Sequence, residues 1–96
     1  KGSILTTNLE IGNFNHINLN CTVGHDVQFH DYITVYPGVN ISGNVRINDC
    51  VEIGTGTKII QGKEIVKETV IGAGSVVVKD IVENGTYIGV PAKQMK

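Results

Sequence analysis

The sequence predicts an all-β fold, a parallel β-helix built from hexapeptide repeats. A large apolar residue returns at every sixth position from residue 5 to residue 77, and an apolar or small residue stands two places before most of them. β-Branched residues dominate this series, and a period of six does not fit the 3.6-residue turn of an α-helix. The thirteen residues of the series are Leu5, Ile11, Ile17, Val23, Phe29, Val35, Ile41, Ile47, Ile53, Ile59, Ile65, Ile71 and Val77.

Each hexapeptide is predicted to form a short strand followed by a corner. The strands span three residues and end on the apolar series, in order 9–11, 15–17, 21–23 and onward to 75–77, because alternation over three residues turns two side chains inward. Glycine or asparagine often follows, and both tolerate the positive φ expected at a sharp corner. These corner residues are Gly12, Asn18, Gly24, Asn48, Gly54 and Gly72.

The apolar series stops before Glu83, where a charged residue takes the next sixth position. Residues 1–96 are therefore predicted to be a single domain, with a regular repeat over about 5–80 and a C-terminal tail over 81–96.

Composition and charge exclude several classes of function. A net charge of −1 offers no attraction to nucleic acid or to an anionic membrane surface. No apolar run approaches the roughly 20 residues of a membrane-spanning helix, so no membrane insertion is expected. Cys21 and Cys50 have neither metal-ligand spacing nor a disulfide framework around them, which predicts a reducing compartment, the cytoplasm.

Four stretches give the sequence a resemblance to a known family: VGHDVQFHDYITVYPGVNISGNVRI, VEIGTGTKI, VIGAGSVVVKD and IGVPAKQMK. It resembles the C-terminal left-handed β-helix domain of bacterial nucleotide-sugar and sialic-acid acetyltransferases, within the hexapeptide-repeat acyltransferase superfamily. The resemblance implies a three-sided, left-handed coil of about 18 residues per turn, and hence about five coils. It also implies acetyl-CoA as co-substrate, a homotrimer, and sites between subunits. The family's usual N-terminal α/β nucleotide-binding domain is absent from residues 1–96, so the chain is expected to be a C-terminal fragment or a minimal relative.

His25 falls in a column of stacked corners. With 18 residues per turn, Thr7, His25, Gly43 and Gln61 stack about 4.7–4.9 Å apart. Gly43 has no side chain, so the space beside the His25 imidazole is predicted to be open, with an approachable backbone N–H. A base beside such an amide suits acyl transfer. From the residues alone, an exposed turn histidine is the plainer interpretation; the family resemblance implies that His25 is the general base and that the Asp26 carboxylate supports it.

Small residues stack at a second corner. The columns are Tyr36–Gly54–Gly72, Pro37–Thr55–Ala73–Pro91 and Gly38–Gly56–Gly74. They indicate tight corner geometry, and also a shallow groove in which an extended pantetheine arm could lie. The resemblance places the acetyl-CoA contacts on Thr34, Gly43, Thr55 and Ala73, although relatives often carry histidine in place of Thr34.

Three further residues have both a functional and a plain interpretation. Asn18 matches a family asparagine near the acceptor sugar, and it is equally well a corner asparagine. Lys93 and Lys96 are expected either near a CoA phosphate or in a solvated tail.

The leading hypothesis is an acetyltransferase that transfers the acetyl group of acetyl-CoA to an amino group of a nucleotide-linked sugar, with O-acetylation left open and no metal. One alternative is a trimerising β-helix that is inactive without an N-terminal domain. Another is a γ-class carbonic anhydrase, because His25 and His30 have the spacing of two of its zinc ligands; a third would lie upstream, beyond the chain. His30 is otherwise a solvated turn residue, His16 has no assigned role, Cys21 is expected in the core and Cys50 is expected to be inert.

Overall fold

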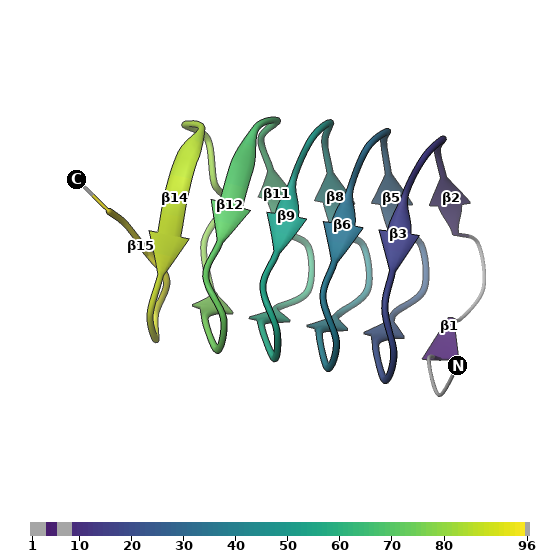
Figure 1. The fold of residues 1–96 in the computed structure, drawn as a ribbon, viewed down its shortest axis with the longest axis horizontal. Coiled ribbons are helices and arrows are strands. Elements are labelled where there is room, and N and C mark those ends of the chain that lie inside the picture. Colours follow the sequence, from purple (N-terminus) through teal and green to yellow (C-terminus); the bar gives the residue numbers. More distant parts are fainter. Residues whose placement is uncertain (1–3, 6–8, 96) are drawn as a thin grey trace.

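The computed structural model describes residues 4, 5 and 9–95, and these residues form strands and corners with no helix among them. Figure 1 shows the chain winding as a solenoid, with its two termini at opposite ends. The strands are β1 (Ile4–Leu5), β2 (Glu10–Ile11), β3 (His16–Ile17), β4 (Thr22–Val23), β5 (Gln28–Phe29), β6 (Thr34–Val35), β7 (Asn40–Ile41), β8 (Arg46–Ile47), β9 (Glu52–Ile53), β10 (Lys58–Ile59), β11 (Glu64–Ile65), β12 (Thr69–Ile71), β13 (Val76–Val77), β14 (Gly85–Ile88) and β15 (Lys93–Gln94).

Three sheets form the sides of a triangular prism. Sheet A has the order β1-β4-β7-β10-β13, sheet B has the order β11-β8-β5-β2, and sheet C has the order β15-β14-β12-β9-β6-β3. From β1 to β13, neighbouring strands pair in parallel with an 18-residue offset, as in Thr22 with Asn40. Strands β1 to β12 make four turns, and β13, the Ile65–Ile81 bridge and β14 form a shorter last coil, where the sequence predicted about five coils.

Three edges join the sheets and hold the corners. The A–B edge contains residues 24–26, 42–44 and 60–62; the B–C edge contains 12–14, 30–32, 48–50 and 66–68; and the C–A edge contains 18–20, 36–38, 54–56 and 72–74. Residues that stack along one edge therefore come from successive coils.

The core is a narrow column of branched aliphatic side chains. From Val23 to Val77 every residue of the sixfold series is buried, with at most 3% of its surface exposed. Three polar residues also face inward, and each donates its hydroxyl to a backbone carbonyl: Thr57 to Gly72 (3.1 Å), Thr69 to Val66 (2.8 Å) and Ser75 to Gly72 (2.7 Å). The periodicity thus predicted the inward-facing residues correctly.

The predicted position of positive φ is wrong. Positive φ occurs three residues after the core residue, as at Asp26 (φ 60°) and Gly56 (φ 74°), and not at the glycine that directly follows the strand. Those first glycines serve close packing between coils instead. A β-carbon at Gly24 would lie 2.6 Å from the Gly43 nitrogen, and one at Gly54 would lie 2.7 Å from the Ala73 nitrogen.

The last coil is two residues shorter than the others. Ile81 pairs with Ile65 and Tyr87 pairs with Ile71, so the offset falls from 18 residues to 16. Residues 81–88 of the predicted tail therefore continue the solenoid, and antiparallel β15 closes this end. The shorter corner shifts the stacking by two residues, so the register places Gly89 over Ala73. The predicted column Pro37–Thr55–Ala73–Pro91 is therefore wrong at its last residue.

The opposite end of the solenoid leaves inward-facing residues partly uncovered. Leu5 and Ile11 are 47% and 44% exposed, although both belong to the core series. No helix among the described residues is long and apolar enough to span a membrane.

Candidate active site

His25 and Asp26 form a hydrogen-bonded pair on the A–B edge, in the corner after β4. The His25 Nδ1 atom lies 3.0 Å from Oδ2 of Asp26, and the two side chains are 58% and 47% exposed. A carboxylate only accepts hydrogen bonds, so in the neutral ring this contact favours the tautomer with the proton on Nδ1 and the lone pair on Nε2. Nε2 is then the proton acceptor of this exposed pair.

Gly43 lies directly against the His25 imidazole, in the next coil. A β-carbon at residue 43 would be 3.1 Å from both Cε1 and Nε2 of His25, and Gly43 is buried. The structure brings the two residues together as the 18-residue spacing predicts. The sequence predicted that the missing side chain of Gly43 leaves an empty space. That is wrong, because the His25 imidazole occupies the place that such a side chain would take.

The backbone N–H of Gly43 differs from the corresponding groups of the B–C edge. There, Asn13 N–H donates to Oδ1 of Asp31 (2.8 Å), and Asp31 N–H donates to Oδ1 of Asp49 (2.9 Å). Within the part of the chain that the structure describes, no hydrogen bond uses the Gly43 N–H. This N–H is thus a candidate donor, next to the base, for an oxygen that gains negative charge.

The other predicted acetyl-CoA contacts lie elsewhere on the prism. Thr34 is on β6 of sheet C, where its Cα neighbours are His16 and Glu52. Thr55 and Ala73 are exposed on the C–A edge, and a β-carbon at the adjacent Gly56 or Gly74 would meet no atom within 4 Å. The C–A edge is therefore open, but one chain does not bring it to Gly43, because sheet A lies between the two edges.

Asn18 occupies the C–A edge and binds the next coil. Its Nδ2 donates to the Val35 carbonyl at 2.9 Å, as Asn48 Nδ2 donates to the Ile65 carbonyl at 2.8 Å. This repeated contact supports the plain interpretation of Asn18 as a corner residue, and it places Asn18 on a different edge from His25.

The remaining candidate residues lie apart from His25. Lys93 is exposed on β15, and Lys96 lies outside the described residues. Cys21 is buried and Cys50 is exposed, both as free thiols. His25 and His30 lie on different edges, and among residues 4, 5 and 9–95 no three His, Cys, Asp or Glu side chains come together to hold a metal ion.

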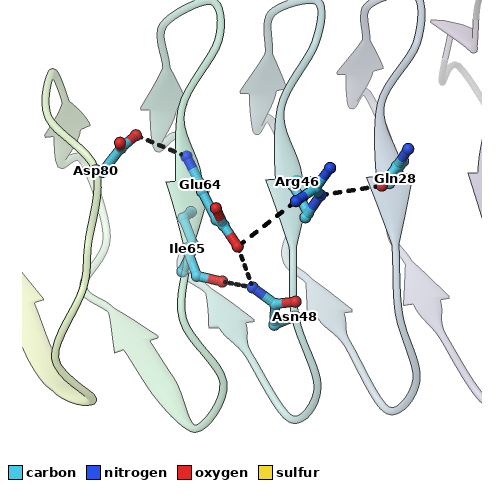
Figure 2. A network of polar contacts seen from close by, with 6 residues as sticks. All are labelled: Gln28, Arg46, Asn48, Glu64, Ile65 and Asp80. Atoms are coloured by element: carbon cyan, nitrogen blue, oxygen red, sulfur yellow. Dashed lines mark hydrogen bonds and ion pairs between the residues drawn. The ribbon is translucent and has the colours of Figure 1, made fainter.

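A hollow adjoins Asp26 on the outer side of sheet B, and the sequence did not indicate it. Its volume is about 280 Å³. Figure 2 shows part of its wall: Arg46 Nε donates to Gln28 Oε1 at 3.1 Å, and Arg46 Nη1 lies 4.0 Å from Glu64 Oε2. The lining residues are Asp26, Gln28, Asn44, Val45, Arg46, Gly62, Lys63 and Glu64. The 18-residue spacing of Gln28, Arg46 and Glu64 was the available signal, but it did not reveal a depression.

No protein-family model matches the chain. Among curated proteins, GDP-perosamine N-acetyltransferase of Escherichia coli O157:H7 is 43% identical over 70 residues, which cover 73% of this chain and 31% of that protein. Serine acetyltransferase of Bacillus pumilus is 33% identical over 79 residues, which cover 74% of this chain and 36% of that protein. The chain thus spans about a third of the length of these relatives.

Solved structures match nearly the whole chain. WeeI from Acinetobacter baumannii AYE superposes with a TM-score of 0.92 at 38% identity, covering 96% of this chain and 46% of that one. The acetyltransferase domain of PglB from Neisseria gonorrhoeae FA1090, in complex with acetyl coenzyme A, superposes with a TM-score of 0.85 at 28% identity, covering 98% of this chain and 55% of that one.

Proposed function

The chain is a left-handed β-helix domain of the hexapeptide-repeat acetyltransferase type, and on that premise we propose that it transfers the acetyl group of acetyl-CoA to an amino group of a nucleotide-linked sugar. The His25–Asp26 pair over Gly43 is the observation on which the proposal rests. A base with a free Nε2 lone pair and an unused backbone N–H adjoin each other there. These are the two groups that acyl transfer to an amine requires.

Acetyl-CoA, when bound, supplies the acetyl group as a thioester. The nitrogen of the acceptor amine forms a bond to the thioester carbonyl carbon, and His25 Nε2 accepts the proton that this nitrogen loses. The Gly43 N–H donates to the carbonyl oxygen as negative charge develops on it. The C–S bond then breaks, and His25 returns the proton to the departing sulfur. Asp26 holds the ring in place through the hydrogen bond at Nδ1.

The relatives support the class of acceptor. The name of the 43% identical protein gives an amino sugar linked to GDP as its substrate. The name of the 33% identical protein gives serine, whose hydroxyl would accept the acetyl group as an ester. The higher identity favours N-acetylation of a nucleotide-linked sugar, and O-acetylation of an amino acid is the second candidate. The two free cysteines fit a cytoplasmic setting, where acetyl-CoA is available.

The geometry supports a homotrimer with shared sites. His25 lies on the A–B edge, whereas Thr55 and Ala73 lie on the C–A edge of the same chain. In a closed threefold assembly with parallel coil axes, the A–B edge of one chain meets the C–A edge of the next when sheet A faces the axis. Acetyl-CoA on the strip of Thr55 and Ala73 would then face His25 of a neighbouring copy.

Turnover by the 96-residue chain tests this proposal. The chain would be incubated with acetyl-CoA and either GDP-perosamine or L-serine, and release of CoA thiol would be measured. Transfer to GDP-perosamine is expected. Binding of acetyl-CoA without turnover of either acceptor would favour a trimerising β-helix that needs a further domain. Stoichiometric zinc in the purified protein would instead revive the carbonic anhydrase alternative.

A further inference from the structure

Lys63 occupies a position that holds a buried valine in the two preceding coils, and a partly buried Leu9 in the first. The pairing of β11 with β8 places Lys63 opposite Val45, and Val27 precedes them by one coil. Val27 and Val45 are 0% and 1% exposed, whereas Lys63 is only partly buried and lines the hollow beside Asp26. Valine would fill this position at no electrostatic cost, while a lysine must keep its ammonium in contact with polar groups. Core packing therefore does not explain this lysine.

The hollow holds two cations: Arg46, which has one distant ion pair, and Lys63, which has none among the described residues. Among the described residues, no carboxylate comes within 4.0 Å of the Lys63 ammonium, and the nearest carboxylate oxygen to the Arg46 guanidinium is at 4.0 Å. Arg46 uses its Nε for Gln28, and its terminal nitrogens retain donors. Arg46 and Lys63 line the same hollow, and a guanidinium with free donors together with an ammonium fits an oxyanion.

The same hollow also has two carboxylates, and each already has a hydrogen-bond partner. Asp26 is engaged with the His25 ring at 3.0 Å, and Glu64 accepts from Asn48 Nδ2 at 3.3 Å (Figure 2). A ligand with an amine or hydroxyl at one end and an oxyanion at the other would place its nucleophile at His25 and its charge at Arg46 and Lys63. A simple anion that carries no nucleophile would bind only to Arg46 and Lys63.

We propose that this hollow binds the oxyanion of the acetyl acceptor through Lys63 and Arg46, an inference that rests on the proposed function. The shared chemistry is an oxyanion a few bonds from the acetylated atom. Its source is either the diphosphate of a nucleotide-linked sugar or the carboxylate of an amino acid. Lys63 and Arg46 thereby determine acceptor specificity, while His25 performs the proton transfer.

Lys63→Val separates binding from stability, because valine is the residue of the stacked positions. The substitution is expected to retain the fold and to raise the KM for the acceptor by about tenfold to a hundredfold, the loss expected for one charged hydrogen bond. The kcat and the KM for acetyl-CoA should stay within about threefold. Lys67→Val, the same change on the B–C edge, is the matched control and should leave all three constants unchanged.

Two probes identify the source without turnover. Backbone amide shifts of Gly62 and Lys63 would be followed by NMR during titration with inorganic pyrophosphate and, separately, with L-serine. Shifts that occur in the parent and in Lys67→Val, but not at Gly62 of Lys63→Val, support the subsite, and the effective probe names the source. If neither probe shifts these amides, or if Lys63→Val binds as the parent does, the subsite is wrong. Probe binding without acetyl transfer would contradict the proposed enzyme and leave the oxyanion subsite standing.

Discussion

The imidazole of His25 lies where a side chain at residue 43 would project, and a β-carbon there would be 3.1 Å from two atoms of the ring. Such a separation is below ordinary van der Waals contact, so the ring must move if residue 43 gains a side chain. The orientation of the proposed base is therefore set by two contacts: the Asp26 carboxylate at Nδ1 and the bare backbone of the next coil.

His25→Ala should abolish acetyl transfer while leaving the fold and acetyl-CoA affinity nearly unchanged. A general base contributes about 10²–10⁴ in rate, and the exposed side chain contributes little packing. Steady-state kinetics with saturating acetyl-CoA measure the loss. His30→Ala, an exposed histidine on the B–C edge, is the control and should keep full activity. A His25→Ala rate within threefold of the parent would remove His25 from the mechanism. Asp26→Asn should lower the rate less, because the ring keeps its place over Gly43.

Gly43→Val should lower kcat by about 10²-fold, because the new side chain would push the His25 imidazole away from its position next to the reacting atoms. Circular dichroism and oligomeric state would be compared with the parent, since Gly43 is buried. Gln61→Val makes a similar change one coil further along the same column and should be nearly silent. Full activity in a folded Gly43→Val protein would mean that the position of the ring over residue 43 is irrelevant to the reaction.

Mixed assemblies test whether the site is shared between chains. A His25→Ala chain and an Ala73→Trp chain should each be inactive alone, the first lacking the base and the second blocked on the C–A edge. After subunit exchange at equal concentrations, about one site in four should combine an intact base with an intact groove. Thiol release from acetyl-CoA would be measured before and after exchange. Exchange demonstrated by mass spectrometry without any gain in activity would place the whole site within one chain.

Asp80→Ala should lower the free energy of unfolding by about 0.5–1.5 kcal/mol. At the shortened corner of the last coil, Asp80 Oδ1 accepts the Glu64 N–H at 2.9 Å, a contact visible in Figure 2. Removing the carboxylate leaves that N–H to water. Asp80→Asn retains an Oδ1 acceptor and should retain most of the stability. Urea denaturation measures both, and equal losses in the two variants would show that the hydrogen bond is not the stabilising element.

Stability should fall at high pH through Tyr87. Burial, with a smaller contribution from the Glu83 carboxylate, raises the pKa of Tyr87 above its ordinary value near 10. Above that ordinary value the unfolded chain releases the phenolic proton before the folded chain does, so the folded state binds more protons and the free energy of unfolding decreases as pH rises. Tyr87→Phe should flatten the decrease above about pH 10 and, through loss of the hydroxyl bond to the Glu83 carbonyl, shift stability by a constant amount below it. Identical alkaline slopes in the two proteins would contradict this assignment.

Periodicity was sufficient to predict which side chains enter the core and which corners stack. It failed where a contact between coils, and not the local chain, decides the geometry. The sequence predicted positive φ at Gly24 and Gly54. The structure shows instead that they are glycine because a β-carbon there would clash with the backbone of the next coil. The two-residue shortening before Ile81 was visible only as the end of a series, because a sequence period cannot show that stacking resumes with a new offset. Lys63 belonged to the inward series by spacing, and only the hollow explains why a charge is tolerated there.

Because the first coil is less buried than the central coils, its backbone hydrogen bonds are expected to open more often than theirs. Ile11 is 44% exposed, whereas Ile47 and Ile53, two coils further on, are fully enclosed. In a repeat architecture each coil is stabilised mainly by its neighbours, so strands whose core residues are less buried open more readily. Amide protons of β2 and β3 should then exchange with solvent sooner than those of β8 and β9. His25 follows β4, which pairs with β1 of the first coil. A molecule that binds to the first coil would therefore also restrict the motion of the proposed base.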